Sequence, residues 1–450
     1  LTREARKDEF KGQNPCLHRT EHLLRAPALP PARANFPRAM RILRTSVWQL
    51  GQNFMGKSRQ AEHAALIDWL LAQVQQHAID AVLIAGDIFD TGTPPSYARE
   101  LYSTLVVRLH AAGTGLLLLG GNHDSVATLR ESSALIELLS ARVVPSIQTP
   151  AEQLRVLPLR GTSQPGCIVC AVPFIRARDV VKTEFGQSAE DRQLQLLGAI
   201  KAYYHATFDA ACALQTQLQK ETGRRVPILG TGHLTTVGAS SSESVREIYV
   251  GTLDAFPTSE FPPLDYLALG HIHKPQKVGG KEHIRYSGSP IYLSFDETSQ
   301  TKQMLLVDLN ETGLQSVTEL EIPTFQRLMT LRGDIETLET QLPLIASETP
   351  AGHTVWMEIT VATDDYLPDL PARIQSMTEG LPVEVLRIRR DRGQAVAQLF
   401  DGSGATLDEL DPHDVFARRL AQETDMQEGM RESLTTRYRQ MVTTPTEGEQ

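Results

Sequence analysis

Residues that can bind a metal follow four apolar runs of this 450-residue chain. One Asp, one Asn and several His form a mixed oxygen and nitrogen set, which suits Mn, Fe or Zn better than Mg or Ca. A carboxylate can bridge two metals that are roughly 4 Å apart, and such a pair can clamp a phosphoryl group. The metal set is drawn from Asp87 in "VLIAGDIFD", Asn122 and His123 in "LLLLGGNHD", His233 in "PILGTGH", and His271 and His273 in "YLALGHIH", and Asp124 follows His123 as a further candidate site residue.

The order of these turns makes the pattern specific. A single His in a turn is usually structural, and Asn, His and Asp are ordinary turn residues. Four such turns, each after an apolar strand-like run, are better explained by a common site. Ligands bind at the carboxyl edge of the strands in open α/β sheets, so we expect these side chains to meet there.

Apolar runs alternate with helical patterns from Met40 to about residue 310. "DAVLIAG" and "GTGLLLLGG" are continuous apolar runs, as expected of strands that are covered on both faces. "KQMLLVDL" and "LQSVTELEI" alternate like strands of a half-exposed sheet. These patterns predict an α/β sandwich, flanked by helices and with some antiparallel strands, over residues 40–323.

The pattern changes at "IPTFQRLMTLRG", where a strand, helix, strand, helix and strand follow one another. We expect a smaller α+β domain over residues 324–400. Residues 401–450 are mainly helical and rich in charge, so their helices either dock on another protein or form a solvated closing pair. The final "TTPTEGEQ" is expected to be a disordered tail.

Composition limits the remaining possibilities. Residues 1–39 have little apolar content, which predicts a disordered or artefactual leader, with a transit peptide as the weaker alternative. The net charge of −10 argues against a chain coated in DNA-binding charge but does not exclude nucleic acid as a substrate. Cys167 and Cys170 are better explained as buried strand thiols than as half a zinc site. We expect a cytoplasmic protein without a membrane span.

The series of turns resembles the calcineurin-like metallophosphoesterase superfamily and, within it, the SbcD family. The resemblance extends from Met40 to about residue 440. The segments "LGHIHKPQ" and "YSGSPIYLSFDE" are the most telling, because generic phosphoesterases do not require them. The segments that carry the resemblance are "GQNF", "GDIFDTGTPPSYAR", "GNHDSVATL", "TGHLTTVGA", "VGTLDAFP", "LGHIHKPQ" and "YSGSPIYLSFDE".

The resemblance implies a manganese-dependent phosphodiesterase that acts on DNA ends and hairpins. It implies ATP-dependent exonuclease activity on double strands in the 3′ to 5′ direction, endonuclease activity on single strands, and roles in DNA repair, recombination and replication. The implied partner is an SbcC-like SMC-type ATPase, which would bind the ATP, in a complex with two copies of each protein. Residues 324–400 would be the capping domain, and the C-terminal helices would dock on the partner.

The resemblance also implies roles for the site residues. His123 would protonate the leaving oxygen or stabilise the charged transition state, with Asp124 orienting it. Of two divalent metal ions, the first would share Asp87 with the second and would also use His273. The second would be held by Asp87, Asn122, His233 and His271.

The first turn departs from this family pattern. The family motif "TSDWHLG" supplies an Asp and a His, whereas this chain reads "TSVWQLG". Val47 cannot bind metal, and Gln49 offers a weak, neutral oxygen, so the first metal keeps two of four ligands. Arg44, where the family usually has His, is expected on the opposite face of the strand from Val47, which makes it a poor replacement for the lost charge.

Three functions are compatible with these observations. The first is an active nuclease subunit, and the second is a catalytically impaired scaffold that binds DNA ends for its ATPase partner. Metal-dependent hydrolysis of a simple phosphodiester would separate these two. The third is a small-molecule phosphodiesterase, which would need neither the capping domain nor the C-terminal helices.

Overall fold

The computed structural model describes residues 38–181, 188–240, 255–362, 369–391 and 434. The chain divides into two compact units, the first ending at Gln326 and the second beginning at Arg327. Nearly all of the expected leader and of the expected C-terminal helices lies outside the described residues. Within the described part, no helix combines the length and the apolar character that a membrane span requires.

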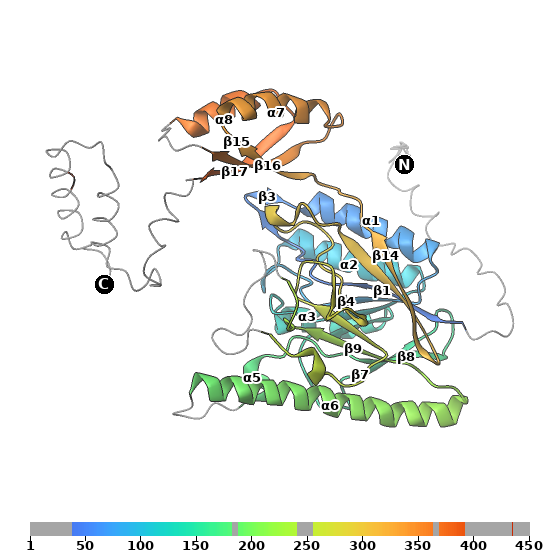
Figure 1. Ribbon diagram of the computed structural model, residues 1–450. Coiled ribbons are helices and arrows are strands. Elements are labelled where there is room, and N and C mark those ends of the chain that lie inside the picture. The colour runs from blue at the N-terminus through green and yellow to red at the C-terminus, as the bar shows by residue number, and fades with distance from the viewer. Residues whose placement is uncertain (1–37, 182–187, 241–254, 363–368, 392–433, 435–450) are drawn as a thin grey trace, which may run out of the picture. The chain divides into compact units, whose positions relative to one another are not determined.

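The first unit contains two six-stranded sheets (Figure 1). The first sheet has the order β14 (Gly313–Glu321), β13 (Gln303–Asn310), β1 (Met40–Thr45), β4 (Ala81–Ala85), β5 (Gly115–Leu119) and β6 (Ala141–Val144). The second has the order β11 (Gln276–Val278), β12 (Lys281–Tyr286), β10 (Tyr266–Gly270), β9 (Ile228–His233), β8 (Pro165–Cys170) and β7 (Leu154–Pro158).

Strand directions follow the sequence pattern. The apolar strands β1, β4, β5 and β6 are parallel neighbours, while β13 and β14 join them as an antiparallel pair. In the second sheet, β8, β9, β10 and β12 are parallel, and β7 and β11 are antiparallel edge strands. The predicted α/β sandwich with some antiparallel strands is therefore confirmed.

Three apolar clusters hold the layers together. One cluster lies between the two sheets and includes Leu83, Leu117 and Val169. A second joins the first sheet to α1 (Gln60–Gln76) and α2 (Ser96–Ala111). A third joins the second sheet to α6 (Ala189–Thr222), the long helix in Figure 1. The result is a sandwich in which helices cover the outer face of each sheet.

The helix α6 has clear start and stop signals. The Ser188 side chain accepts a hydrogen bond from the Asp191 amide at 3.0 Å, which caps the first turn. Gly223 ends the helix with φ of 72°, a left-handed conformation that glycine adopts without a steric penalty. The remaining short elements of this unit are β2 (Asn53–Phe54), β3 (Lys57–Ser58), α3 (Val126–Glu131), α4 (Ser133–Glu137), α5 (Ala177–Val180), η1 (Thr258–Glu260) and η2 (Phe295–Glu297).

The second unit is built from alternating strands and helices. Its three strands form a parallel sheet in sequence order, and the cluster around Leu338, Met357 and Ile374 joins that sheet to the helices. This alternation is the one expected from "IPTFQRLMTLRG" onward. The elements are β15 (Leu328–Gly333), α7 (Ile335–Ser347), β16 (Val355–Ala362), α8 (Leu370–Thr378) and β17 (Val383–Asp391).

Candidate metal centre

Four polar turns meet at the carboxyl edge of the two sheets. Ligand atoms of Asp87, His233 and His271 all lie within 4.8 Å of one another, and these three residues are buried. Asn122 joins them, because its Oδ1 is 2.9 Å from His233 Nε2 and 3.2 Å from His271 Nδ1. The structure thus brings together the four residues that the sequence suggested for the second metal, two from each sheet.

Two glycines permit this close approach. A Cβ at Gly121 would collide with the Asp87 carboxylate, and a Cβ at Gly86 would collide with the His233 imidazole. Gly86 also has φ of 88°, which glycine adopts most readily. The glycine-rich sequence of these turns therefore follows from the crowding of the ligands.

The orientation of His233 fits a cation. Its Nδ1 lies 2.9 Å from the Ala85 carbonyl oxygen, which accepts the N–H of that nitrogen. Nε2 then presents its lone pair to the oxygens of Asn122 at 2.9 Å and Asp87 at 3.1 Å. Three electron-rich atoms that face one another require a proton or a cation between them, so the donor set fits a divalent ion.

For Asp87 and His271, the surroundings favour the deprotonated side chain. Burial raises the pKa of Asp87, but His233, His123 and His271 together outweigh burial, so that the pKa lies well below its usual value. Burial, together with the neighbouring His233, lowers the pKa of His271 to about 3. The carboxylate and the neutral imidazole are the forms that bind metal. For His233, burial lowers the pKa, but the Asp87 carboxylate outweighs that effect and raises it.

His273 is not part of this close group. Its Nδ1 lies 3.0 Å from Glu297 Oε1, and both side chains are buried. A ligand role for His273 would therefore use the other ring nitrogen, Nε2. Sequence reasoning missed Glu297 as an individual residue, although it ends the "YSGSPIYLSFDE" segment that carries part of the family resemblance.

His123 and Asp124 make contacts other than those expected. The Asp124 carboxylate accepts hydrogen bonds from the backbone amides of Gly121, Ile88 and Phe89 at 2.8 to 3.1 Å. The His123 Nδ1 instead lies 2.8 Å from the Asp90 carbonyl oxygen. Asp124 thus joins the turns after β4 and β5, and it acts on His123 through the backbone rather than on the imidazole directly.

The first turn has an unusual backbone for the residues that it carries. Val47 has φ of 54° and Gln49 has φ of 46°. A β-branched residue rarely adopts a positive φ, whereas Asp and Asn adopt it more easily. Val47 is fully buried in the apolar cluster beneath α1 and α2, and Gln49 Oε1 accepts a hydrogen bond from Gln52 at 3.4 Å. These two side chains do not complete a metal site.

Arg44 lies on the opposite face of the sheet from Val47, as strand alternation predicted. It pairs with Leu83 and Leu305, which belong to the cluster between the sheets, and its guanidinium donates to the Leu269 carbonyl oxygen. Its Nε and Nη1 are buried, and among the described residues they have no hydrogen-bond partner. Burial lowers the pKa of Arg44. This side chain introduces a charge into the core and supplies nothing to the site.

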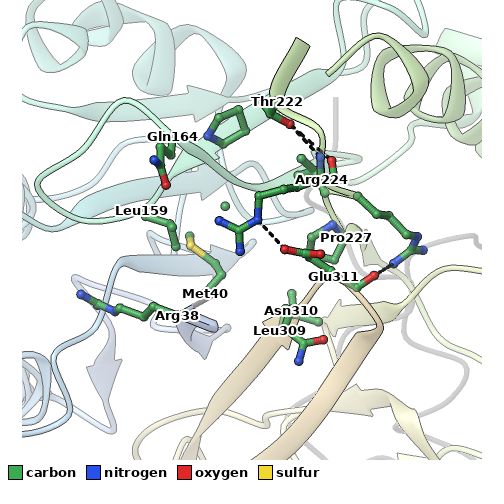
Figure 2. A pocket seen from close by; sticks show the side chains of 14 residues that line it. Arg38, Met40, Leu159, Gln164, Thr222, Arg224, Pro227, Leu309, Asn310 and Glu311 are labelled. Atoms are coloured by element: carbon green, nitrogen blue, oxygen red, sulfur yellow. Dashed lines mark hydrogen bonds and ion pairs between the residues drawn. The ribbon is translucent and has the colours of Figure 1, made fainter. Parts of the chain in front are cut away.

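A cavity of about 260 Å³ lies at the opposite edge of the sandwich (Figure 2). It opens beside the amino ends of β1, β8 and β9, where Met40, Pro165 and Pro227 line it. The arginines around it are paired with carboxylates, namely Arg38 with Asp80, Arg224 with Glu311 and Arg225 with Asp265. The cavity therefore has neither the ligands of the metal centre nor an excess of positive charge.

Comparisons with known proteins agree with this geometry. Residues 48–275 match the family model of calcineurin-like phosphoesterases, and residues 324–424 match that of the type 5 capsule protein repressor C-terminal domain. A dimetal phosphatase structure from Danio rerio aligns with 63% of this chain and 99% of its own, at 12% identity and a TM-score of 0.36. That structural similarity is weak and adds nothing to the strand order given above.

Curated relatives are more informative. The SbcD component of the SbcCD nuclease from Escherichia coli strain K12 is 48% identical over 387 residues, which cover 85% of this chain and 93% of the relative. The protein of the same name from Rhodobacter capsulatus is 29% identical over 77% of this chain and 86% of its own length. With its phosphoesterase match, its paired sheets and its cluster of Asp, Asn and His ligands, the chain belongs to the SbcD family of calcineurin-like phosphoesterases.

Proposed function

We propose that this chain is the nuclease subunit of an SbcCD-like complex and hydrolyses phosphodiester bonds in DNA. The observation that carries the proposal is the convergence of Asp87, Asn122, His233 and His271 at one sheet edge. Their mixed oxygen and nitrogen donors favour manganese over magnesium. The names of the curated relatives supply the substrate class and the complex.

A divalent ion in this site supplies Lewis-acid chemistry to a phosphodiester. The protein residues supply position and proton transfer. The Asp90 carbonyl holds Nδ1 of His123, so that Nε2 is the nitrogen that serves the leaving 3′ oxygen. Asp124 fixes the turn from which both Asn122 and His123 project, through three backbone hydrogen bonds.

The wider function follows the family. The complex acts as an ATP-dependent 3′ to 5′ exonuclease on double-stranded ends and as an endonuclease on single strands and hairpins. It serves DNA repair, recombination and replication in the cytoplasm. An SbcC-like ATPase binds the ATP, with two copies of each protein in the complex. Residues 324–400 cap the DNA, and the helices after residue 401 dock on the ATPase.

A second candidate function rests on Val47 and Gln49. With neither side chain able to replace an Asp or a His, the first metal keeps only Asp87 and His273 as ligands. The chain would then bind DNA ends for its ATPase partner without cutting them. The fold, the partner and the capping domain are the same for both functions, so only an assay of phosphodiester hydrolysis distinguishes the nuclease from the scaffold.

Metal titration by calorimetry tests the proposal. We expect one tight site per chain for Mn²⁺ and a second, much weaker site, because only one set of ligands is complete. The variant H271A should lose the tight site, whereas H110A, which alters an exposed histidine on α2, should keep it. Absence of any tight site would contradict the metal centre, and two equal tight sites would contradict the assignment of Val47 and Gln49. Manganese-dependent cleavage of a simple phosphodiester then separates the nuclease from the silent scaffold.

A further inference from the structure

A buried chain of charged groups lies behind His273. His273 Nδ1 is 3.0 Å from Glu297 Oε1, and the other carboxylate oxygen of Glu297 is 2.6 Å from Lys302 Nζ. The exposed fractions of the three residues are 2%, 0% and 4%. Three titratable side chains in contact and out of water are costly unless each has a specific partner.

Each group in this chain has further partners that fix its position. Glu297 Oε2 also accepts from the Leu293 amide at 3.0 Å and from Ser289 Oγ at 3.3 Å. Lys302 Nζ also donates to Ser289 Oγ at 2.9 Å, and it lies 5.4 Å from the centre of the Tyr292 ring. Oε2 thus has three donors, whereas Oε1 faces the imidazole and also accepts a hydrogen bond from Ser294 Oγ at 3.3 Å.

The direction of charge is consistent with this arrangement. The Lys302 ammonium lies 2.6 Å from Glu297 Oε2, which places a positive charge beside the carboxylate. An ionised carboxylate accepts the Nδ1–H of a neutral imidazole. The ring then holds its lone pair on Nε2, the arrangement in which a carboxylate orients a metal-binding histidine.

We propose that Glu297 is a positioning residue for the first metal. Its carboxylate accepts the Nδ1–H of His273, which leaves Nε2 as the ring nitrogen that would bind a first metal, and the Lys302 ammonium holds that carboxylate in place. The inference rests on the proposed function and deepens it, because the support for this site is intact although Val47 and Gln49 are not ligands. It also gives a role to the "YSGSPIYLSFDE" segment, which generic phosphoesterases do not require.

A purely structural role is the alternative. In that case the ion pair would only hold residues 289–302 together, and the protonation of His273 would not depend on it. The two roles differ in what happens to the imidazole in a protein that stays folded.

The first experiment needs neither metal nor activity. Nitrogen-15 NMR of histidine-labelled, metal-free protein reports the tautomer of each imidazole, and the H273Q variant identifies the signals of His273. We expect the Nδ1–H tautomer. Its replacement by the Nε2–H tautomer, or by an equal mixture of the two, would overturn the inference even if every substituted variant failed to fold.

The second experiment measures metal affinity in the repaired background V47D/Q49H. E297M/K302M replaces the ion pair with two flexible side chains of similar length, so that no buried charge is left alone. E297Q/K302M keeps an acceptor oxygen but loses the charge. The matched control is D68M/R108M, which removes an exposed ion pair, with 65% and 43% of the two side chains accessible.

We expect first-site Mn²⁺ affinity to fall about 10- to 100-fold in E297M/K302M, which is typical for the loss of such a partner. E297Q/K302M should fall in between, and the control should not change. If the repaired parent binds two metals and a folded E297M/K302M variant binds both with the same affinities, the role of Glu297 is overturned. The proposed two-metal function would stand in that case. A repaired parent without a second site would overturn the two-metal function and this role of Glu297 with it.

Discussion

Val47 and Gln49 are the two side chains on which the proposed two-metal centre depends. V47D returns an anionic oxygen ligand, and Q49H returns an imidazole. We expect the double reversion to raise manganese-dependent cleavage of hairpin-ended DNA, in complex with the ATPase partner, by at least roughly 100-fold, since several kcal/mol of transition-state stabilisation depend on the metals. Each single reversion should gain much less, because these ligands act as a unit.

The control for this prediction is His123. In the repaired chain, H123A should remove most of the gained rate without releasing metal, because its imidazole bonds to the Asp90 carbonyl and not to the ligand cluster. If the unrepaired chain cuts as fast as the repaired one, Val47 and Gln49 do not limit the reaction. The attacking water would then be activated without the first metal.

Arg44 is the residue with the clearest cost to stability. Its Nε and Nη1 meet no hydrogen-bond partner of good geometry among the described residues, and the buried Tyr266 hydroxyl is near enough to interact with the guanidinium, in a layer formed mainly by apolar side chains. We expect R44M to increase the free energy of unfolding by about 1 to 4 kcal/mol, because an apolar side chain removes the cost of burying the charge. Urea denaturation measures the change.

Arg285 provides the comparison for Arg44. It is also buried, but it forms ion pairs with Glu282 and Glu319. R285M should therefore leave stability unchanged or reduced. A loss of stability in R44M as large as that in R285M would show that Arg44 is compensated after all.

At the scale of single residues, the sequence predicted the meeting of the candidate ligands but not the residues that surround them. Asp87, Asn122, His233 and His271 each follow an apolar strand and a glycine, so their meeting at one edge was predictable. Glu297 and Lys302 were not, because a carboxylate and an ammonium in a loop look like surface residues. Only the folded chain shows that both are buried behind His273.

His63 on helix α1 contacts the backbone of the turn after β1. The ring Nε2 of this buried residue lies 2.9 Å from the Trp48 carbonyl oxygen, between the two altered positions. Burial, followed by the charge of Arg59, lowers the pKa of His63 to about 4. A neutral imidazole on α1 thus fixes the turn after β1.

A dependence of stability on pH follows from this shift. The pKa of His63 is lower in the folded chain than in the unfolded chain, so the unfolded chain takes up the proton first as the pH falls. The contribution of neutral His63 to the free energy of unfolding is fully present above about pH 6.5 and is lost as the pH falls toward 4. We expect the loss between pH 7 and pH 4.5 to be roughly 2 to 3 kcal/mol smaller in H63Q than in the parent.

Urea denaturation at the two pH values tests this prediction. H110Q is the control, because His110 is exposed on α2 of the same unit and should show the parental loss. An equal loss in H63Q and the parent would mean that His63 is not the group that takes up the proton on unfolding.

Elements were easier to predict than their pairing. The runs "DAVLIAG", "LLLLGG" and "YLALG" all became strands, because continuous apolar sequence is stable only when both faces are covered. The order of strands was not predictable, since β13 pairs with β1 across more than 250 residues of chain. The length of α6 was also missed, although Ser188 and Gly223 mark its ends.

At the scale of the whole molecule, the prediction concerns the ATPase partner. A chain that ends at residue 402 keeps every strand that the structure describes and loses the region expected to dock. We expect this truncated chain to retain metal binding and to lose association with the SbcC-like ATPase, as measured by co-purification. Co-purification at full stoichiometry would place the docking surface within the first 402 residues.

The turn after β1 is held by its backbone. The amides of Val47, Trp48, Gln49 and Leu50 donate to the carbonyl oxygens of Gly86, Asp87 and Ile88 at 2.8 to 3.0 Å. These backbone contacts maintain the turn with Val47 and Gln49 in place, and they do not use either side chain. A carboxylate and an imidazole there would favour manganese, whereas a thiolate would favour zinc. The same scaffold thus offers two adjacent positions at which the metal preference of a phosphoesterase can be chosen by substitution.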